Sequence, residues 1–160
     1  MIINLFPWLS SAWKELSRRR PALPHALLIH GRPGLGKTAL ARAFGQGLLC
    51  ETPGSDGYPC GACQACRWFE QGNHPDFRQV EPEALAANPM GDGEGPAKGA
   101  AAPSRQIKVD QIRELQEFLT IGTHRGGARV ILVRPAEAMN AATANALLKS
   151  LEEPPPGTVF

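Results

Sequence analysis

Residues 31–38 decide the fold, and they read in order Gly31, Arg32, Pro33, Gly34, Leu35, Gly36, Lys37 and Thr38. This stretch fits the phosphate-loop pattern G-x-x-x-x-G-K-[ST] without a mismatch. Glycines let the backbone wrap closely around phosphate groups, at the positive end of the helix that follows. The lysine of such a loop reaches the β- and γ-phosphates, and the threonine binds magnesium. We therefore expect these eight residues to bind ATP or ADP with Mg²⁺.

The segments on both sides of this loop have the periodicity that the motif requires. Residues 26–29 form an apolar run that predicts a buried strand. After the loop, Leu40, Phe44 and Leu48 share one face of a helix that we expect to end near Cys50. Because a strand before and a helix after are the context of a true phosphate loop, a chance glycine-rich turn is the weaker interpretation.

Further strands and helices alternate along the rest of the chain. Residues 76–80 and 130–133 predict strands, and residues 158–160 predict the opening of another strand. Apolar side chains at helical spacing predict helices over 109–119 and 144–151. Fully apolar strands that alternate with helices predict an α/β fold, in which helices flank a parallel sheet.

Residues 84–105 differ from the rest in composition, because they carry almost no large apolar side chains. Such a segment cannot offset its ordering entropy by burial. We expect it to be a flexible surface loop. It is an insertion within a single domain that spans residues 1–160, rather than a boundary between two domains.

The bulk composition fits a globular protein and argues against several partners. The 160 residues are 42% hydrophobic and carry a formal net charge of +2, which is too small to indicate nucleic-acid binding. No apolar stretch is long enough to span a bilayer, and the N-terminus lacks the basic region of a signal peptide. We expect no membrane partner, a cytoplasmic location and reduced thiols.

The cysteines lie together in one short module over residues 50–66, at positions Cys50, Cys60, Cys63 and Cys66. Four thiolates are a complete tetrahedral set for zinc, and a closed set of this kind is structural rather than catalytic. Two alternatives stay open, an iron–sulfur cluster and unligated thiols. Against the cluster, Glu70 stands where a fourth ferredoxin-type cysteine would be.

The residues after the second predicted strand speak against ATP hydrolysis. P-loop ATPases usually hold magnesium and orient water with acidic residues at this strand end. Here the run over 129–133 is followed by Arg134 and Pro135, and a cation would repel magnesium. Glu137 lies three residues further on and is an unlikely substitute. We therefore expect phosphate binding without turnover, and we assign no catalytic residue.

Four motifs of this chain together resemble those of the bacterial clamp-loader AAA+ family of DNA polymerase III. They are residues 31–38, the cysteine triplet at 60–66, GNHPDF at 72–77 and ANALLKSLEEPP at 144–155. The last is close to the box ANALLKxLEEPP of that family. The resemblance implies a structural zinc on the four cysteines and a strand at 158–160 that lies between residues 26–29 and 130–133.

Within that family, the zinc module is carried by the gamma/tau motor and by a stator subunit. The missing acidic pair and the opening Phe6-Pro7-Trp8-Leu9 resemble the stator. The resemblance then implies assembly with delta and gamma/tau, to place the sliding clamp on primed DNA. It also implies an arginine finger, a lid and a collar beyond Phe160. The alternatives are an active motor and a small-molecule kinase, although a kinase has no need of the box before Pro154.

Overall fold

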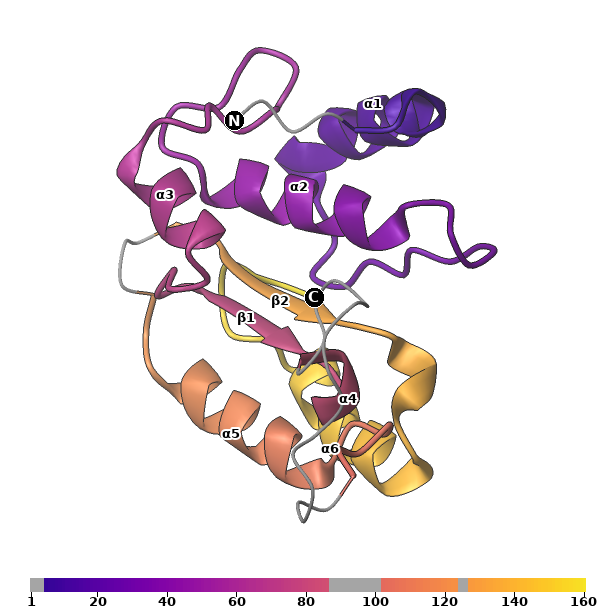
Figure 1. The fold of residues 1–160 in the computed structure, drawn as a ribbon. Helices are drawn as coiled ribbons and strands as arrows, with labels where there is room; N and C mark the ends of the chain where they lie inside the picture. Colours follow the sequence, from indigo (N-terminus) through magenta and orange to yellow (C-terminus); the bar gives the residue numbers. More distant parts are fainter. Residues whose placement is uncertain (1–4, 87–101, 124–126) are drawn as a thin grey trace. The chain divides into compact units, whose positions relative to one another are not determined.

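The structure is a computed structural model that describes residues 5–86, 102–123 and 127–160 (Figure 1). Its elements in chain order are the 3₁₀ turn η1 (Pro7–Leu9), α1 (Ser10–Arg19), η2 (Arg20–Ala22), α2 (Lys37–Leu49), α3 (Gln64–Glu70), β1 (Phe77–Val80), α4 (Glu83–Ala86), α5 (Val109–Thr120), β2 (Arg129–Val133), η3 (Ala136–Ala138), α6 (Ala141–Glu152) and β3 (Thr158–Val159). The chain forms two compact units. The first comprises residues 1–78, 122–132 and 156–160, and the second comprises 79–121 and 133–155.

The strands form one sheet in the order β1-β2-β3. β2 and β3 are parallel, with Arg129 opposite Thr158. Val130 donates its N–H to the carbonyl of Asp76, and Arg134 donates to that of Val80, both at 2.9 Å. The donor residue number rises from 130 to 134 while the acceptor residue number rises from 76 to 80. β1 and β2 therefore also run in the same direction. The predicted α/β fold with a parallel sheet is confirmed at this level, and so are the strands expected at 76–80, 130–133 and 158–160.

The strand predicted over residues 26–29 is wrong in its detail. The segment is not a regular strand, and Leu28 is 79% exposed rather than buried. It still lies beside β3, since Leu27 donates its N–H to the carbonyl of Phe160 and Phe160 donates to that of His25. The implied position of residues 158–160, between this segment and β2, is therefore confirmed. An apolar run shows that a segment suits a sheet, but burial also needs a partner on each face.

The core of the first unit forms where α2 packs on α1 and on β2. The ring of Trp13 is 2% exposed and meets the ring of Phe44 edge to face, with centroids 6.1 Å apart. Leu40 shares the face of Phe44, as the helical spacing predicted. On the sheet side, a Cβ on Gly45 would lie 3.0 Å from Cγ1 of Val130. The helix approaches the strand this closely because position 45 has no side chain.

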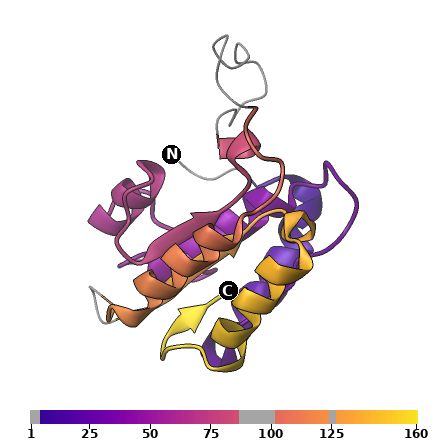
Figure 2. The same cartoon turned by 90° about the horizontal axis from the view of Figure 1, so that it is seen from below.

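In the second unit α5 and α6 lie side by side (Figure 2). The predicted apolar face of α5 is buried, with Ile112 fully enclosed. Polar bonds fix the register of the pair, because Gln116 donates its side-chain amide to the carbonyl of Ala146 at 2.9 Å. The buried Thr143 hydroxyl, 3.2 Å from the carbonyl of Ile107, donates to it. The helices expected over 109–119 and 144–151 are confirmed.

The loop expected over residues 84–105 is described only at its two ends. Residues 87–101 lie outside the described part of the chain. Residues 84–86 belong to α4, so this portion of the prediction is wrong. The two ends are tied to each other, since the Ser104 N–H donates to the carboxylate of Glu83 at 3.2 Å and the Lys108 ammonium pairs with it at 2.6 Å. Local ion pairing, which composition does not report, orders these flanks.

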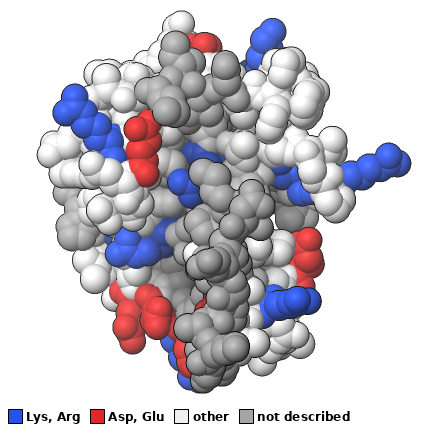
Figure 3. Space-filling view, in the orientation of Figure 1, with Lys and Arg blue, Asp and Glu red and all other residues white. Residues whose placement is uncertain are grey.

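Charge and apolar length agree with the composition. Within residues 5–86, 102–123 and 127–160, no helix combines the length and the apolar character needed to cross a membrane. On the face shown in Figure 3, the described Lys and Arg side chains are interspersed with Asp and Glu rather than gathered in one basic stripe.

Asn140, the residue directly before α6, offers a test of the fold. Asn140 has extended backbone angles, and its side-chain oxygen accepts the N–H of Thr143 at 2.9 Å. We expect Asn140→Ala to lower the free energy of unfolding by about 1 kcal/mol, because a backbone donor at the helix start loses its partner. Denaturant unfolding followed by circular dichroism measures this change.

Asn145→Ala is the matched control, since Asn145 is an exposed residue of the same helix. Its effect should stay within about 0.5 kcal/mol. Equal losses in the two variants would show that the cap does not stabilise α6.

Candidate metal centre and phosphate loop

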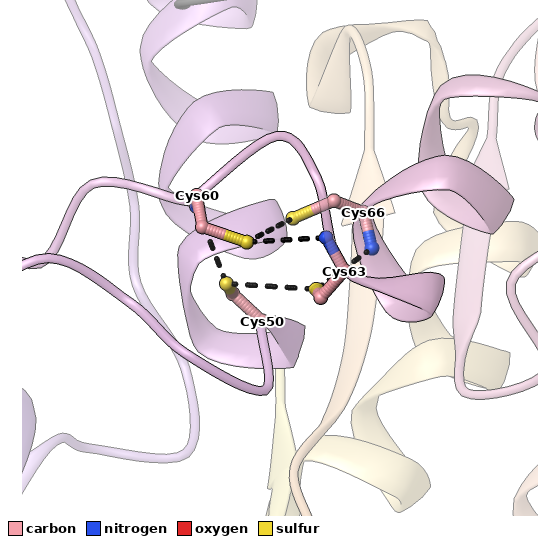
Figure 4. A group of neighbouring side chains, drawn as sticks. All are labelled: Cys50, Cys60, Cys63 and Cys66. Atoms are coloured by element: carbon pink, nitrogen blue, oxygen red, sulfur yellow. Dashed lines mark hydrogen bonds between the residues drawn. The ribbon is translucent and has the colours of Figure 1, made fainter.

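The four cysteines come from two helices and the loop that joins them (Figure 4). Cys50 directly follows α2, Cys60 lies in the loop, Cys63 precedes the first residue of α3, and Cys66 lies in its first turn. All four are free thiols whose sulfur atoms point toward one another, and every pair lies within 4.8 Å. The structure thus brings together the complete set that the sequence predicted.

The sulfur spacing fits a single metal ion. Cys50 Sγ lies 3.8 Å from Cys63 Sγ, and Cys60 Sγ lies 4.0 Å from Cys66 Sγ. Sulfurs at the corners of a tetrahedron around zinc are about 3.8 Å apart, since each Zn–S bond is about 2.3 Å. A disulfide would need about 2.05 Å. The residues therefore fit one tetrahedral ion.

Backbone N–H groups point at the sulfur atoms, as a thiolate site requires. The N–H of Cys60 donates to Cys50 Sγ at 3.3 Å, and the N–H of Cys63 donates to Cys60 Sγ at 3.3 Å. The N–H of Cys66 donates to Cys63 Sγ at 3.4 Å. Such donors favour the charged form of the acceptor, so the local fold prepares these thiols to bind a cation.

The thiols differ in their ease of ionisation. A hydrogen bond with the Thr52 side chain, helped by backbone N–H groups, lowers the pKa of Cys60 to about 6. Burial instead raises the pKa of Cys50 and that of Cys66. Two buried thiolates would need a compensating positive charge, which a bound divalent metal would supply.

The loop that leads to Cys60 rests on α1. The indole N–H of Trp13 donates to the carbonyl of Asp56 at 3.0 Å, and the ring stacks on Tyr58 with centroids 4.0 Å apart. The helical spacing of Leu9, Trp13 and Leu16 predicts only that Trp13 lies on an apolar helix face. Its contact with a residue more than 40 positions away has no local signal.

The phosphate loop has the backbone that its glycines imply. Gly31, Gly34 and Gly36 all have positive φ, and α2 begins at Lys37 directly after them. At Gly36, with φ of +84°, a Cβ would also lie 2.8 Å from the ring of Phe6. Glycine is therefore required there by conformation and by space.

Side chains inside and beside the loop hold it in shape. The Lys37 ammonium donates to the carbonyls of Gly31 at 2.7 Å and Arg32 at 2.9 Å. The indole N–H of Trp8, a ring that stacks on Phe6, donates to the carbonyl of Leu35 at 3.1 Å. Sequence reasoning read the aromatic opening only as a family feature, and it missed this support of the loop. In a phosphate complex, phosphate oxygens would replace those carbonyls as the hydrogen-bond acceptors of the Lys37 ammonium.

In the second unit, the end of β2 carries a cation that is already paired. Arg134 forms an ion pair with Glu81 at 2.5 Å, and the two side chains are only 28% and 14% exposed. Glu137, which follows in η3, is exposed. The structure thus places an ion-paired arginine directly after β2, where a P-loop ATPase usually has an acidic residue.

His74 is near the cysteines in sequence but does not belong to their cluster. It is 1% exposed, and its Nδ1 accepts the N–H of Asp76 at 3.1 Å. The four ligand candidates grouped by the structure are all cysteines.

Fold and sites together define a class of protein: an α/β domain with a phosphate-loop motif and a cluster of four cysteines that could hold a metal ion. The family model described as "DNA polymerase III, delta subunit" matches residues 10–160. The chain belongs to this family.

Individual relatives agree with that assignment. The chain is 41% identical to DNA polymerase III subunit delta' of Pseudomonas aeruginosa over 157 residues, which are 98% of this chain and 42% of that protein. It is 37% identical to the delta' subunit of Escherichia coli, over 97% of this chain and 41% of that protein. It is 35% identical to the tau subunit of Escherichia coli, over 85% of this chain and 18% of tau. The chain thus spans about two fifths of the delta' relatives.

The metal centre can be tested by removing one ligand. We expect Cys63→Ser to lose the metal, because a hydroxyl is a far poorer ligand than a thiolate for a soft site. Zinc content per chain, measured by atomic emission after purification without added metal, should fall from one to near zero.

Ala62→Ser is the control for this variant. It adds a hydroxyl to the same exposed stretch of loop and leaves every sulfur in place. A metal-free wild-type protein that is fully folded would contradict the assignment of these cysteines.

Proposed function

We propose that this protein works as the delta'-type stator of a bacterial clamp loader. It assembles with delta and gamma/tau subunits, and the assembly places the sliding clamp on primed DNA. Residues 1–160 serve as its N-terminal AAA+ domain, with a metal module over residues 50–66. The family assignment supports this role, as do the names of the relatives that align over nearly the whole chain.

The observation that carries the stator role is the ion pair of Arg134 with Glu81. Hydrolysis by a P-loop protein needs magnesium held near the γ-phosphate and a water oriented for attack. At the strand end that usually supplies acidic groups, this chain has a cation whose partner is another protein side chain. We infer that the chain does not hydrolyse ATP.

The eight residues from Gly31 to Thr38 keep the composition of a nucleotide site. We propose that they bind ATP or ADP with Mg²⁺, through the backbone N–H groups of the loop, the Lys37 ammonium and the Thr38 hydroxyl. This binding would be regulatory or structural. The intact motif and the similarity to tau over 85% of the chain also favour the second candidate, an active gamma/tau-type motor.

The metal of the four cysteines is proposed to be a structural Zn²⁺. The sulfur spacing suits one ion, whereas an iron–sulfur cluster distributes its four thiolates over two or more irons and needs a wider set. A site filled by four protein ligands leaves no open position for a substrate. Its contribution is to fix the path of residues 50–66.

A lysine replacement separates stator from motor. In the complete assembly, we expect Lys37→Ala to leave ATP turnover within about twofold of wild type, because other subunits perform the hydrolysis. The isolated full chain should show no turnover. Steady-state phosphate release measures both quantities.

Lys14→Ala, at an exposed position of α1, is the matched control. Turnover by the isolated chain that disappears only in Lys37→Ala would identify a motor, with another acidic residue such as Glu137 in place of the missing pair.

Assembly itself tests the proposed role directly. The full chain, mixed with delta and gamma/tau subunits, should elute with them as one complex and support clamp loading on primed circular DNA. Leaving it out should abolish loading, because a ring-like assembly with a missing member cannot hold the clamp open. A complex that forms and loads equally well without the chain would refute the role.

A further inference from the structure

Arg20 joins the two chain segments that deliver Cys50 and Cys60. Its Nη2 donates to the carbonyl of Gly47 at 2.7 Å, and its Nη1 donates to the carbonyl of Gly57 at 3.0 Å. Each of these glycines stands three residues before a metal-ligand cysteine. One planar guanidinium therefore sets the separation of the two segments just before their sulfurs meet.

The segments are also in direct backbone contact at this point. A Cβ on Gly47 would lie 2.7 Å from the carbonyl oxygen of Gly57, and Gly57 itself has φ of +82°. A Cβ on Gly57 would in turn lie 2.9 Å from Nη1 of Arg20. The absence of side chains at positions 47 and 57 thus lets the two segments and the guanidinium approach one another closely.

The surroundings of Arg20 differ from those of the arginines beside it. Arg18 and Arg19 pair with Glu15 at the surface, with side chains 73% and 57% exposed. Arg20 is half-buried. A basic run such as residues 18–20 is typical of a solvated helix end, and Arg20 departs from that pattern.

Charge adds to the geometric effect. Burial lowers the pKa of Arg20, and the nearby Cys50 thiolate opposes this by electrostatic attraction. Four thiolates around one divalent ion leave two net negative charges in a partly buried place. A fixed cation close to such a site stabilises its loaded form, as outer groups around metal ligands generally do.

We propose that Arg20 is a positioning residue of the metal centre, which holds the Cys50 and Cys60 segments at the separation that a single metal ion requires. This proposal depends on the metal binding proposed above. Its two hydrogen bonds go to the backbone carbonyls of Gly47 and Gly57, and it acts on the cysteines through these carbonyls. Without it the binding of the ion must itself order the loop, which costs affinity.

The test compares the metal affinity of the full chain with that of Arg20→Ala. Competition with a chromophoric chelator gives the Zn²⁺ affinity, and Co²⁺ substitution reports the coordination geometry through its absorption spectrum. We expect Arg20→Ala to weaken Zn²⁺ binding by about tenfold to a hundredfold, and to weaken the thiolate-to-cobalt absorption bands at equal Co²⁺. Arg18→Ala should match wild type in both measurements.

Arg20→Lys keeps the charge and can reach only one of the two carbonyls, so its affinity should fall between those of wild type and Arg20→Ala. It also serves as the variant to measure if Arg20→Ala does not fold. Affinity and cobalt spectrum equal to wild type, together with lowered thermal stability, would show that Arg20 only packs α1 and would overturn the proposal. A wild-type chain that binds neither metal would refute the metal centre itself.

Discussion

The close contact of α2 with β2 is the constraint on which both candidate sites depend. The helix can approach the strand because Gly45 has no side chain between its backbone and Val130. Its first residue, Lys37, belongs to the phosphate loop, and the residue after its end, Cys50, is the first metal ligand. A single packed helix therefore fixes the start of one site and the end of the other. Any shift of α2 relative to β2 would therefore move both the phosphate loop and the first cysteine of the cluster.

The N-terminal segment then holds α2 at both ends. Trp8 donates to the phosphate loop, Trp13 donates to the cysteine loop, and Arg20 bridges α2 to that same loop. Glycines accompany two of these contacts, at positions 36 and 57, where positive φ and close packing coincide. Residues 8–20 thus support both sites, although none of the four cysteines and no residue of the phosphate loop lies among them.

Sequence reasoning succeeded where the signal was local or periodic. The phosphate loop, the helix from Lys37 and the cysteine cluster each depend on residues that lie close together in the sequence. The structure places them as expected. It failed where the outcome depended on a distant partner. Leu28 belongs to an apolar run yet is exposed, and Arg20 belongs to a basic run yet is half-buried, because packing against other segments decides burial. The contacts of Trp8 and Trp13 could not be predicted for the same reason.

Two interactions within the chain bear on the proposal that the phosphate loop binds nucleotide without turnover. The Lys37 ammonium is satisfied by the carbonyls of Gly31 and Arg32, so the loop keeps its shape through its own hydrogen bonds. Arg134 forms an ion pair with Glu81, so the cation after β2 is not left unpaired. Lys37, which hydrolysis would use, thus has partners inside the protein. So does Arg134, which stands where hydrolysis would need an acidic residue. An arrangement of this kind suits a subunit that keeps the architecture of an ATPase as a scaffold for its neighbours.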